Sequence, residues 1–107
     1  MIDWLLAQGH ATSRLRIQIA GELGTLITDT WMPESRTLIE AKGDATRNDI
    51  RMAVAQLLDY RRHITPAPLR STVVVPIAPT RDLHDFVRSA GLSLAVFDSR
   101  GLTYLVE

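Results

Sequence analysis

Residues 36–43 read Arg-Thr-Leu-Ile-Glu-Ala-Lys-Gly, and this stretch decides how the rest of the chain is arranged. Successive side chains of a strand point to opposite faces, so Glu40 and Lys42 share one face and the apolar side chains beside them share the other. Gly43 ends the pattern next to flexible backbone, where proteins often place ligand-binding groups. We therefore predict a strand over residues 36–42 that displays an acid and a base together at its end.

Two further strands are predicted upstream of this stretch. Apolar and polar side chains alternate in residues 15–20, which is the period of a half-buried strand. Residues 21–24, Gly-Glu-Leu-Gly, supply a turn, and residues 25–31 form a second strand-like run. The proline and serine of residues 32–35 suit a hairpin loop. Three antiparallel strands in succession are expected, with residues 28–30 opposite residues 39–41.

Downstream, the pattern indicates a crossover back to the sheet. Thr46, followed by Asp49, is typical of a helix start, and apolar residues recur at three- and four-residue steps to about His63. Residues 71–77 form a continuous apolar run, typical of a strand covered on both faces, and a return through a helix favours parallel pairing. A second helix ending at Ala90 and a final hairpin over residues 92–106 follow.

A short helix over residues 2–8, stopped by Gly9, precedes these elements and resembles the last turns of something longer. The expected order is thus α-β-β-β-α-β-α-β-β, an α/β fold with a mixed sheet. With 107 residues and 46% apolar content, a single domain over residues 1–107 is the default, either alone or as a module of a longer protein.

Composition excludes several classes of function. The chain has no cysteine, which removes disulfide frameworks, thiolate zinc sites and thiol nucleophiles. Twelve basic and twelve acidic residues give a formal net charge of zero, so any contact with DNA has to use a local patch. The opening residues resemble neither a signal peptide nor a membrane span. We expect a cytoplasmic protein with no membrane partner.

The predicted hairpin brings two carboxylates together at the end of the strand. Pairing residues 28–30 with residues 39–41 places Asp29 near Glu40. With the backbone oxygen of Ala41 they make an oxygen-rich site that suits Mg²⁺ or Mn²⁺. Lys42 would orient a metal-activated water or steady the charge that develops on phosphorus. These residues indicate a hydrolytic phosphodiesterase.

The same residues carry a resemblance to a known family. Asp29, a hairpin, Glu40-Ala41-Lys42 and a helix bearing Gln56 and Tyr60 resemble the PD-(D/E)xK nuclease superfamily, including the Gln-x-x-x-Tyr motif of its RecB-type branch. The resemblance covers mainly residues 15–75. It departs from the family in having Thr28 where many members have proline, and in lacking a glutamate in residues 2–8.

The resemblance implies a restriction-endonuclease-like fold and a Mg²⁺-dependent deoxyribonuclease, an endonuclease module for restriction or repair. It implies that Asp29 and Glu40 are metal ligands and that Lys42 is catalytic. It also implies that Gln56 and Tyr60 help to set the site and meet the nucleic acid.

The binding partners leave alternatives open. Four basic residues of the long helix could track DNA phosphates, and they could equally form a solvated helix face: Arg47, Arg51, Arg61 and Arg62. A homodimer, or a fused or partner DNA-recognition domain, would complete a restriction enzyme. The competing hypotheses are a non-catalytic nucleic-acid-binding or assembly domain with the same fold, and a purely structural dimerisation domain.

Overall fold

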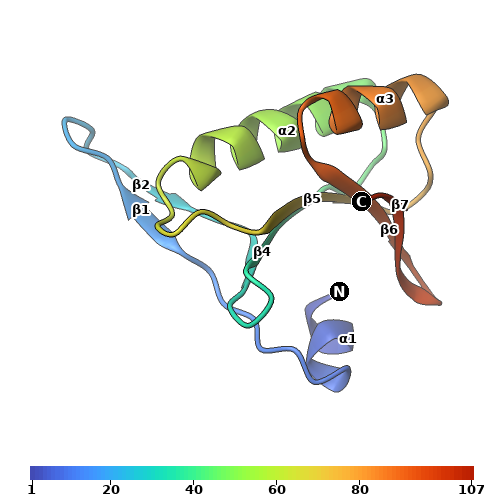
Figure 1. The fold of residues 1–107 in the computed structure, drawn as a ribbon, viewed down its shortest axis with the longest axis horizontal. Coiled ribbons are helices and arrows are strands. Elements are labelled where there is room, and N and C mark those ends of the chain that lie inside the picture. Colours follow the sequence, from blue (N-terminus) through green and yellow to red (C-terminus); the bar gives the residue numbers. More distant parts are fainter.

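The structure is a computed structural model that describes residues 1–107 (Figure 1). In chain order its elements are α1 (Ile2–Ala7), β1 (Arg16–Gln18), β2 (Thr25–Ile27), β3 (Thr30–Met32), β4 (Thr37–Ala41), α2 (Arg47–Arg61), β5 (Arg70–Val75), α3 (Arg81–Ser89), β6 (Ser93–Asp98) and β7 (Gly101–Val106). Strands β3-β4-β5-β6-β7 form one sheet in that order, and β1 and β2 form a separate ribbon. The predicted α/β architecture is confirmed.

The five-stranded sheet is mixed, as expected. Strands β4 and β5, and β5 and β6, pair in parallel, whereas β3 with β4 and β6 with β7 are antiparallel. The parallel pairs are joined by α2 and α3, because a crossover helix is long enough to return the chain to the same end of the sheet. The carboxyl ends of β4, β5 and β6 therefore meet at one edge.

The sequence pattern missed a break in the second predicted strand. Residues 25–31 form two strands, β2 and β3, that lie in different sheets, so four strands precede α2 and not three. Residue 13 pairs with residue 31, and residue 16 pairs with residue 27. Between these two pairs, residues 14–15 on one side lie opposite residues 28–30 on the other, which is one residue more. This is the count of a β-bulge, which bends a strand and changes the direction of its side chains. Asp29 lies within it.

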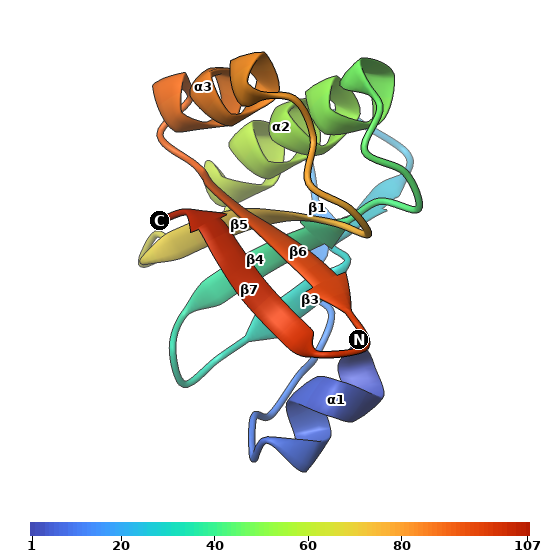
Figure 2. The same cartoon turned by 90° about the vertical axis from the view of Figure 1, so that its right-hand side faces the viewer.

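Helices α2 and α3 cover one face of the sheet (Figure 2). The Thr46 hydroxyl accepts a hydrogen bond from the Asp49 N–H at 3.2 Å, which confirms the predicted start of α2. Its apolar stripe packs against alternate residues of the central strands in the larger core cluster. The buried residues of this stripe are Ile50, Ala53, Val54, Leu57 and Tyr60.

The opposite face is covered by α1 (Figure 1). Leu5 is buried there with Ile39 of β4 and Val74 of β5, and Trp4 meets the Phe97 ring edge-on at 5.9 Å between centroids. Strand β5 is thus covered on both faces, as its continuous apolar run predicts. No helix in the structure combines the length and the apolar character needed to cross a membrane.

Candidate metal centre

Asp29 reaches the end of β4 because of the bulge that precedes β3. Thr30 pairs with Ile39, which is the predicted register, and continuing that register places Asp29 opposite Glu40. The Oδ2 atom of Asp29 accepts a hydrogen bond from the Ala41 N–H at 2.8 Å. The side chain of Asp29 therefore takes the place that a backbone carbonyl would have if β3 continued.

Three hydrogen bonds hold the bulge in shape. The buried Thr28 hydroxyl accepts a hydrogen bond from the Leu15 N–H at 2.9 Å, and the Thr28 N–H donates to the Leu15 carbonyl at 3.0 Å. The Nε of Arg14 donates to the Thr28 carbonyl at 2.9 Å. The polar groups that a broken ladder would leave unpaired are thus satisfied, and Asp29 is fixed in position.

Glu40 and Lys42 point from β4 toward α2, on the shared face that alternation predicts. The Lys42 Nζ lies 3.4 Å from the Glu40 Oε2, and Glu40 is only 7% exposed. The neighbouring residue Ile39 belongs to the smaller core cluster on the α1 side, and Ala41 packs against that cluster. The predicted display of an acid and a base at the strand end is therefore confirmed.

Helix α2 places Gln56 and Tyr60 above these charges. The Lys42 Nζ donates a hydrogen bond to the Gln56 Oε1 at 2.5 Å. Tyr60 lies one turn further along and is buried, and its pKa is raised, first by burial and then by the negative charge of Glu40. Gln56 therefore contacts the site directly, whereas Tyr60 forms a buried wall behind it.

The electrostatics of the site favour an added cation. The pKa of Glu40 is raised above 4.5, mainly because burial disfavours the charged carboxylate, and next because Asp29 is negative. The positive charges of Lys42 and Arg14 lower the pKa of Glu40, but they do not cancel the increase. Two carboxylates in a partly buried site repel each other unless a positive charge lies between them.

The oxygen atoms present fit a hard divalent ion. In a strand the N–H and C=O groups of one residue point to the same neighbouring strand. The Ala41 carbonyl therefore points toward the β3 side, where the Ala41 N–H donates to Asp29. On that side β3 begins only at Thr30, which pairs with Ile39, so no residue of β3 pairs with Ala41. No cluster of three or more His, Cys, Asp or Glu side chains is present. Two carboxylates, one carbonyl and several waters nevertheless suit Mg²⁺, which usually keeps part of its hydration shell.

The four arginines predicted to contact nucleic acid do not form one patch. Arg47 and Arg61 lie at opposite ends of α2, about 20 Å apart at 1.5 Å per residue. The guanidinium of Arg47 pairs with Asp82 at 2.7 Å and that of Arg62 with Asp59 at 2.8 Å. Arg51 is exposed, and Arg61 lines a separate polar pocket at the amino ends of β5 and β6.

Arg14 is a contributor that the sequence pattern did not single out. It lies between the Ser13–Trp31 bridge and β1, beside the bulge, and its charge lowers the pKa of Glu40. In the sequence Arg14 directly precedes the alternating residues 15–20. Nothing in that pattern showed that Arg14 lies close to Asp29. A hollow of about 490 Å³ opens next to it, lined by Ile2, Thr12, Ser13, Arg14, Asp29 and Thr30. Asp29 is therefore reachable from solvent.

Comparisons of the chain with protein-family models, with curated proteins and with solved structures found no match. A function for the chain therefore has to be argued from the geometry and charge of the site itself. The relevant features are the bulge that carries Asp29, the buried Glu40 beside it, and Lys42 held by Gln56.

Proposed function

We propose that this chain is a metal-dependent deoxyribonuclease of the PD-(D/E)xK type, with a restriction-endonuclease-like fold and a role in restriction or repair. One observation carries the proposal. The bulge brings the Asp29 carboxylate onto the Ala41 N–H, next to a buried Glu40 whose Lys42 partner extends from the same strand face. Acids and a base in this arrangement suit phosphodiester hydrolysis.

Asp29, Glu40 and the Ala41 carbonyl would hold Mg²⁺ or Mn²⁺. The bound ion would polarise a phosphoryl oxygen and lower the pKa of a bound water, which is the nucleophile of the reaction. Because Glu40 is buried and its pKa is raised, its carboxylate binds a cation in competition with a proton. With an ion bound, Glu40 would stay charged.

Lys42 supplies the fixed positive charge of the site. Its ammonium lies between the Glu40 Oε2 at 3.4 Å and the Gln56 Oε1 at 2.5 Å, so two neighbours limit its motion. A donor fixed before the reaction stabilises negative charge on the attacked phosphate without having to reorganise. Gln56 is a positioning residue that acts through Lys42, and Tyr60 helps to exclude water behind Glu40.

We propose DNA as the substrate and a second copy or a linked domain as the source of sequence recognition. The net charge is zero, and two of the four predicted phosphate-binding arginines are paired with acids of the same chain. The electrostatic, sequence-independent part of DNA affinity is therefore small for the isolated chain. A homodimer or a fused recognition module would supply the missing contacts.

Plasmid nicking tests the proposed activity. Wild-type protein, Glu40→Gln and Lys42→Ala are incubated with plasmid and with modified phage DNA in Mg²⁺, in Mn²⁺ and in chelator. Arg88→Ala, which alters an exposed pair on α3, is the control. We expect metal-dependent nicking by the wild type and the control, and none by the two site variants. DNA binding that is indifferent to metal and to Lys42→Ala, without cleavage, would instead support a non-catalytic binding domain.

A further inference from the structure

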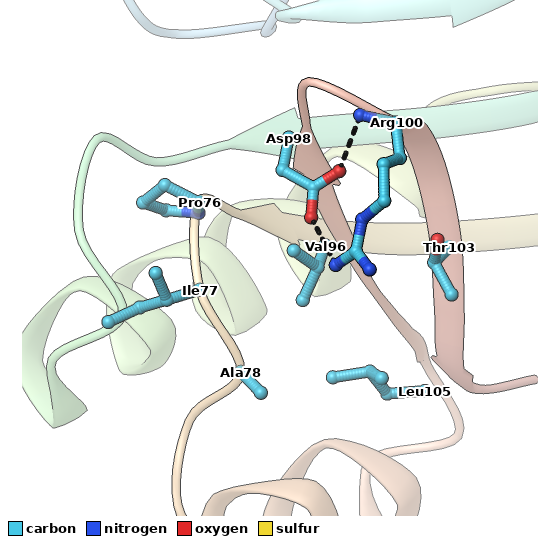
Figure 3. Close-up of a pocket in the computed structure, with 8 residues that line it drawn as sticks. All are labelled: Pro76, Ile77, Ala78, Val96, Asp98, Arg100, Thr103 and Leu105. Carbon is cyan, nitrogen blue, oxygen red and sulfur yellow. Dashed lines mark hydrogen bonds and ion pairs between the residues drawn. The ribbon is translucent and has the colours of Figure 1, made fainter.

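Another pocket lies at the carboxyl edge of the sheet, between the β5–α3 connection and the β6–β7 hairpin (Figure 3). We call it the hairpin pocket. Its volume is about 420 Å³, which is in the range of small-molecule sites, about 300–1,000 Å³. It is lined by Pro76, Ile77, Ala78, Val96, Asp98, Arg100, Thr103 and Leu105.

The hairpin pocket opens on the same face of the sheet as Lys42. Ala41 is in register with Val74, and Val74 with Ala95, so the next row across the sheet is Lys42, Val75 and Val96. Residues of one row point to the same face, and two strand spacings separate the first from the last, about 10 Å. The metal centre lies on the β3 side of β4, further from the pocket than Lys42, so the base that enters the pocket would belong to a nucleotide next to the phosphate at the metal centre.

Asp98 holds the Arg100 guanidinium beside it on the hairpin side of the pocket (Figure 3). The Asp98 Oδ1 accepts from the Arg100 N–H at 2.9 Å, and the Oδ2 accepts from its Nη2 at 3.0 Å. These two hydrogen bonds hold the pKa of Asp98 below its usual value, so the carboxylate stays charged. The Nη1 group of Arg100 and the second hydrogen of its Nη2 remain for a ligand that presents two adjacent acceptors.

The walls of the pocket suit a flat, largely apolar ring. Val96 and Leu105 lie on one side, and Ile77 and Pro76 on the other (Figure 3). Ile77 is 63% exposed, an apolar side chain left to water at the edge of a concave site. Apolar walls with a few fixed polar groups are typical of pockets that bind heterocyclic ligands.

We propose that the hairpin pocket binds the guanine base of a nucleotide next to the cleaved phosphodiester, with Arg100 donating to its O6 and N7. This inference rests on the proposed nuclease function. Guanine is the base that presents two acceptors side by side, whereas adenine pairs an acceptor with a donor on the same edge. The base would enter from single-stranded or unstacked DNA, because a pocket cannot receive a base that is still in the duplex stack.

A titration with mononucleotides tests the pocket without requiring cleavage. Backbone amide NMR spectra are recorded during addition of dGMP, dAMP, dCMP and inorganic phosphate. We expect dGMP to shift residues 76–78 and 96–105 and to bind more tightly than dAMP or dCMP. Arg100→Ala should weaken dGMP binding about tenfold, the effect of losing one bidentate contact to guanine. Arg100 is 86% exposed on its side chain, so the variant should fold.

Two further variants test whether dGMP binds in the hairpin pocket and not through the positive charge of any exposed arginine. Arg88→Ala removes an arginine that is paired with Asp85 outside the pocket, and it should leave dGMP binding unchanged. Ala78→Trp fills the pocket from an exposed position and should abolish binding. Equal binding of all nucleotides, the same shifts with phosphate alone, or equal losses in Arg88→Ala and Arg100→Ala would each overturn the proposal.

The two proposals can fail separately. In metal-free buffer Glu40→Gln should retain dGMP binding, because Glu40 is not part of the hairpin pocket. Selective dGMP binding in a protein that never cleaves DNA would support the pocket and count against the nuclease. Metal-dependent cleavage without any preference for guanine beside the cut, and without dGMP binding, would support the nuclease and overturn the pocket.

Discussion

At the scale of single residues, Glu40 gives the site its dependence on pH. Its pKa in the folded protein is raised above 4.5 by burial and by Asp29. An acid with a raised folded pKa contributes stability that is fully present below its unfolded pKa and is lost as the pH rises through the folded value. The metal-free protein is therefore destabilised by this group at neutral pH.

We expect Glu40→Gln to remove this pH dependence. In chelator the variant should lose less stability than the wild type between about pH 4 and neutral pH, since a neutral amide does not ionise. At pH 7.5, added Mg²⁺ should raise the melting temperature of the wild type and leave that of the variant unchanged. Thermal unfolding in a series of buffers measures both effects. Parallel pH profiles of the two proteins would contradict this account of Glu40.

Gln56 allows the role of Lys42 to be tested without changing a metal ligand. Its amide oxygen is the partner of the Lys42 ammonium at 2.5 Å, so Gln56→Ala frees Lys42 without changing any metal ligand. We expect kcat for DNA cleavage to fall about 10- to 100-fold, the usual effect of removing an outer partner, with Mg²⁺ affinity unchanged. Gln18→Ala, on the exposed ribbon, is the control. An equal loss of metal affinity in Gln56→Ala would show that it acts on the ligands and not through Lys42.

At the scale of elements, the sequence showed which residues share a face but not where a strand bends. Alternation is a local property, so it correctly grouped Glu40 with Lys42, and the predicted hairpin correctly paired Thr30 with Ile39. A bulge adds one residue without a change in composition, so residues 25–31 retained the pattern of a single strand. The bulge depends on Leu15, a partner 13 residues away from Thr28, and single-sequence periodicity does not report such partners.

The Thr28 hydroxyl should be essential to the bulge. Thr28→Val keeps the shape of the side chain but leaves the Leu15 N–H without its acceptor, which should cost about 1–3 kcal/mol of unfolding free energy. Thr25→Val removes an exposed hydroxyl from the same ribbon and should have little effect. Urea unfolding of the two variants measures the difference. Equal stabilities would mean that the hydroxyl does not hold the bulge.

At the scale of the whole molecule, α1 completes the third layer of the fold. Six residues are too few for a helix to be stable alone, so α1 depends on packing by Leu5 and Trp4. Gly101, at the start of β7, makes room for it: a Cβ there would lie 2.4 Å from the Trp4 ring. The sequence predicted this helix and its boundaries closely, but it carried no sign of where the helix docks.

Gly101→Ala should therefore loosen the α1 layer. Gly91→Ala is the matched control, because Gly91 also has a positive φ, +75° against +105°, but has open space around its Cβ position. We expect Gly101→Ala to cost about 1–3 kcal/mol more than the control, which is the usual penalty for overpacking. Denaturant unfolding gives the free energies, and faster amide exchange in residues 2–7 would locate the change. Equal losses of unfolding free energy in the two variants would show that the Trp4 ring moves aside without an energetic penalty.

The proposed metal centre can be tested directly by locating a bound Mn²⁺ ion by NMR. Paramagnetic broadening is followed in the wild type and in Glu40→Gln as Mn²⁺ is added below one equivalent. We expect the amide signals of Asp29, Glu40, Ala41 and Lys42 to broaden first in the wild type, and to be spared in the variant. Early broadening spread over exposed acids such as Asp44 and Asp82, and unchanged by Glu40→Gln, would contradict the metal centre on which the proposed activity depends.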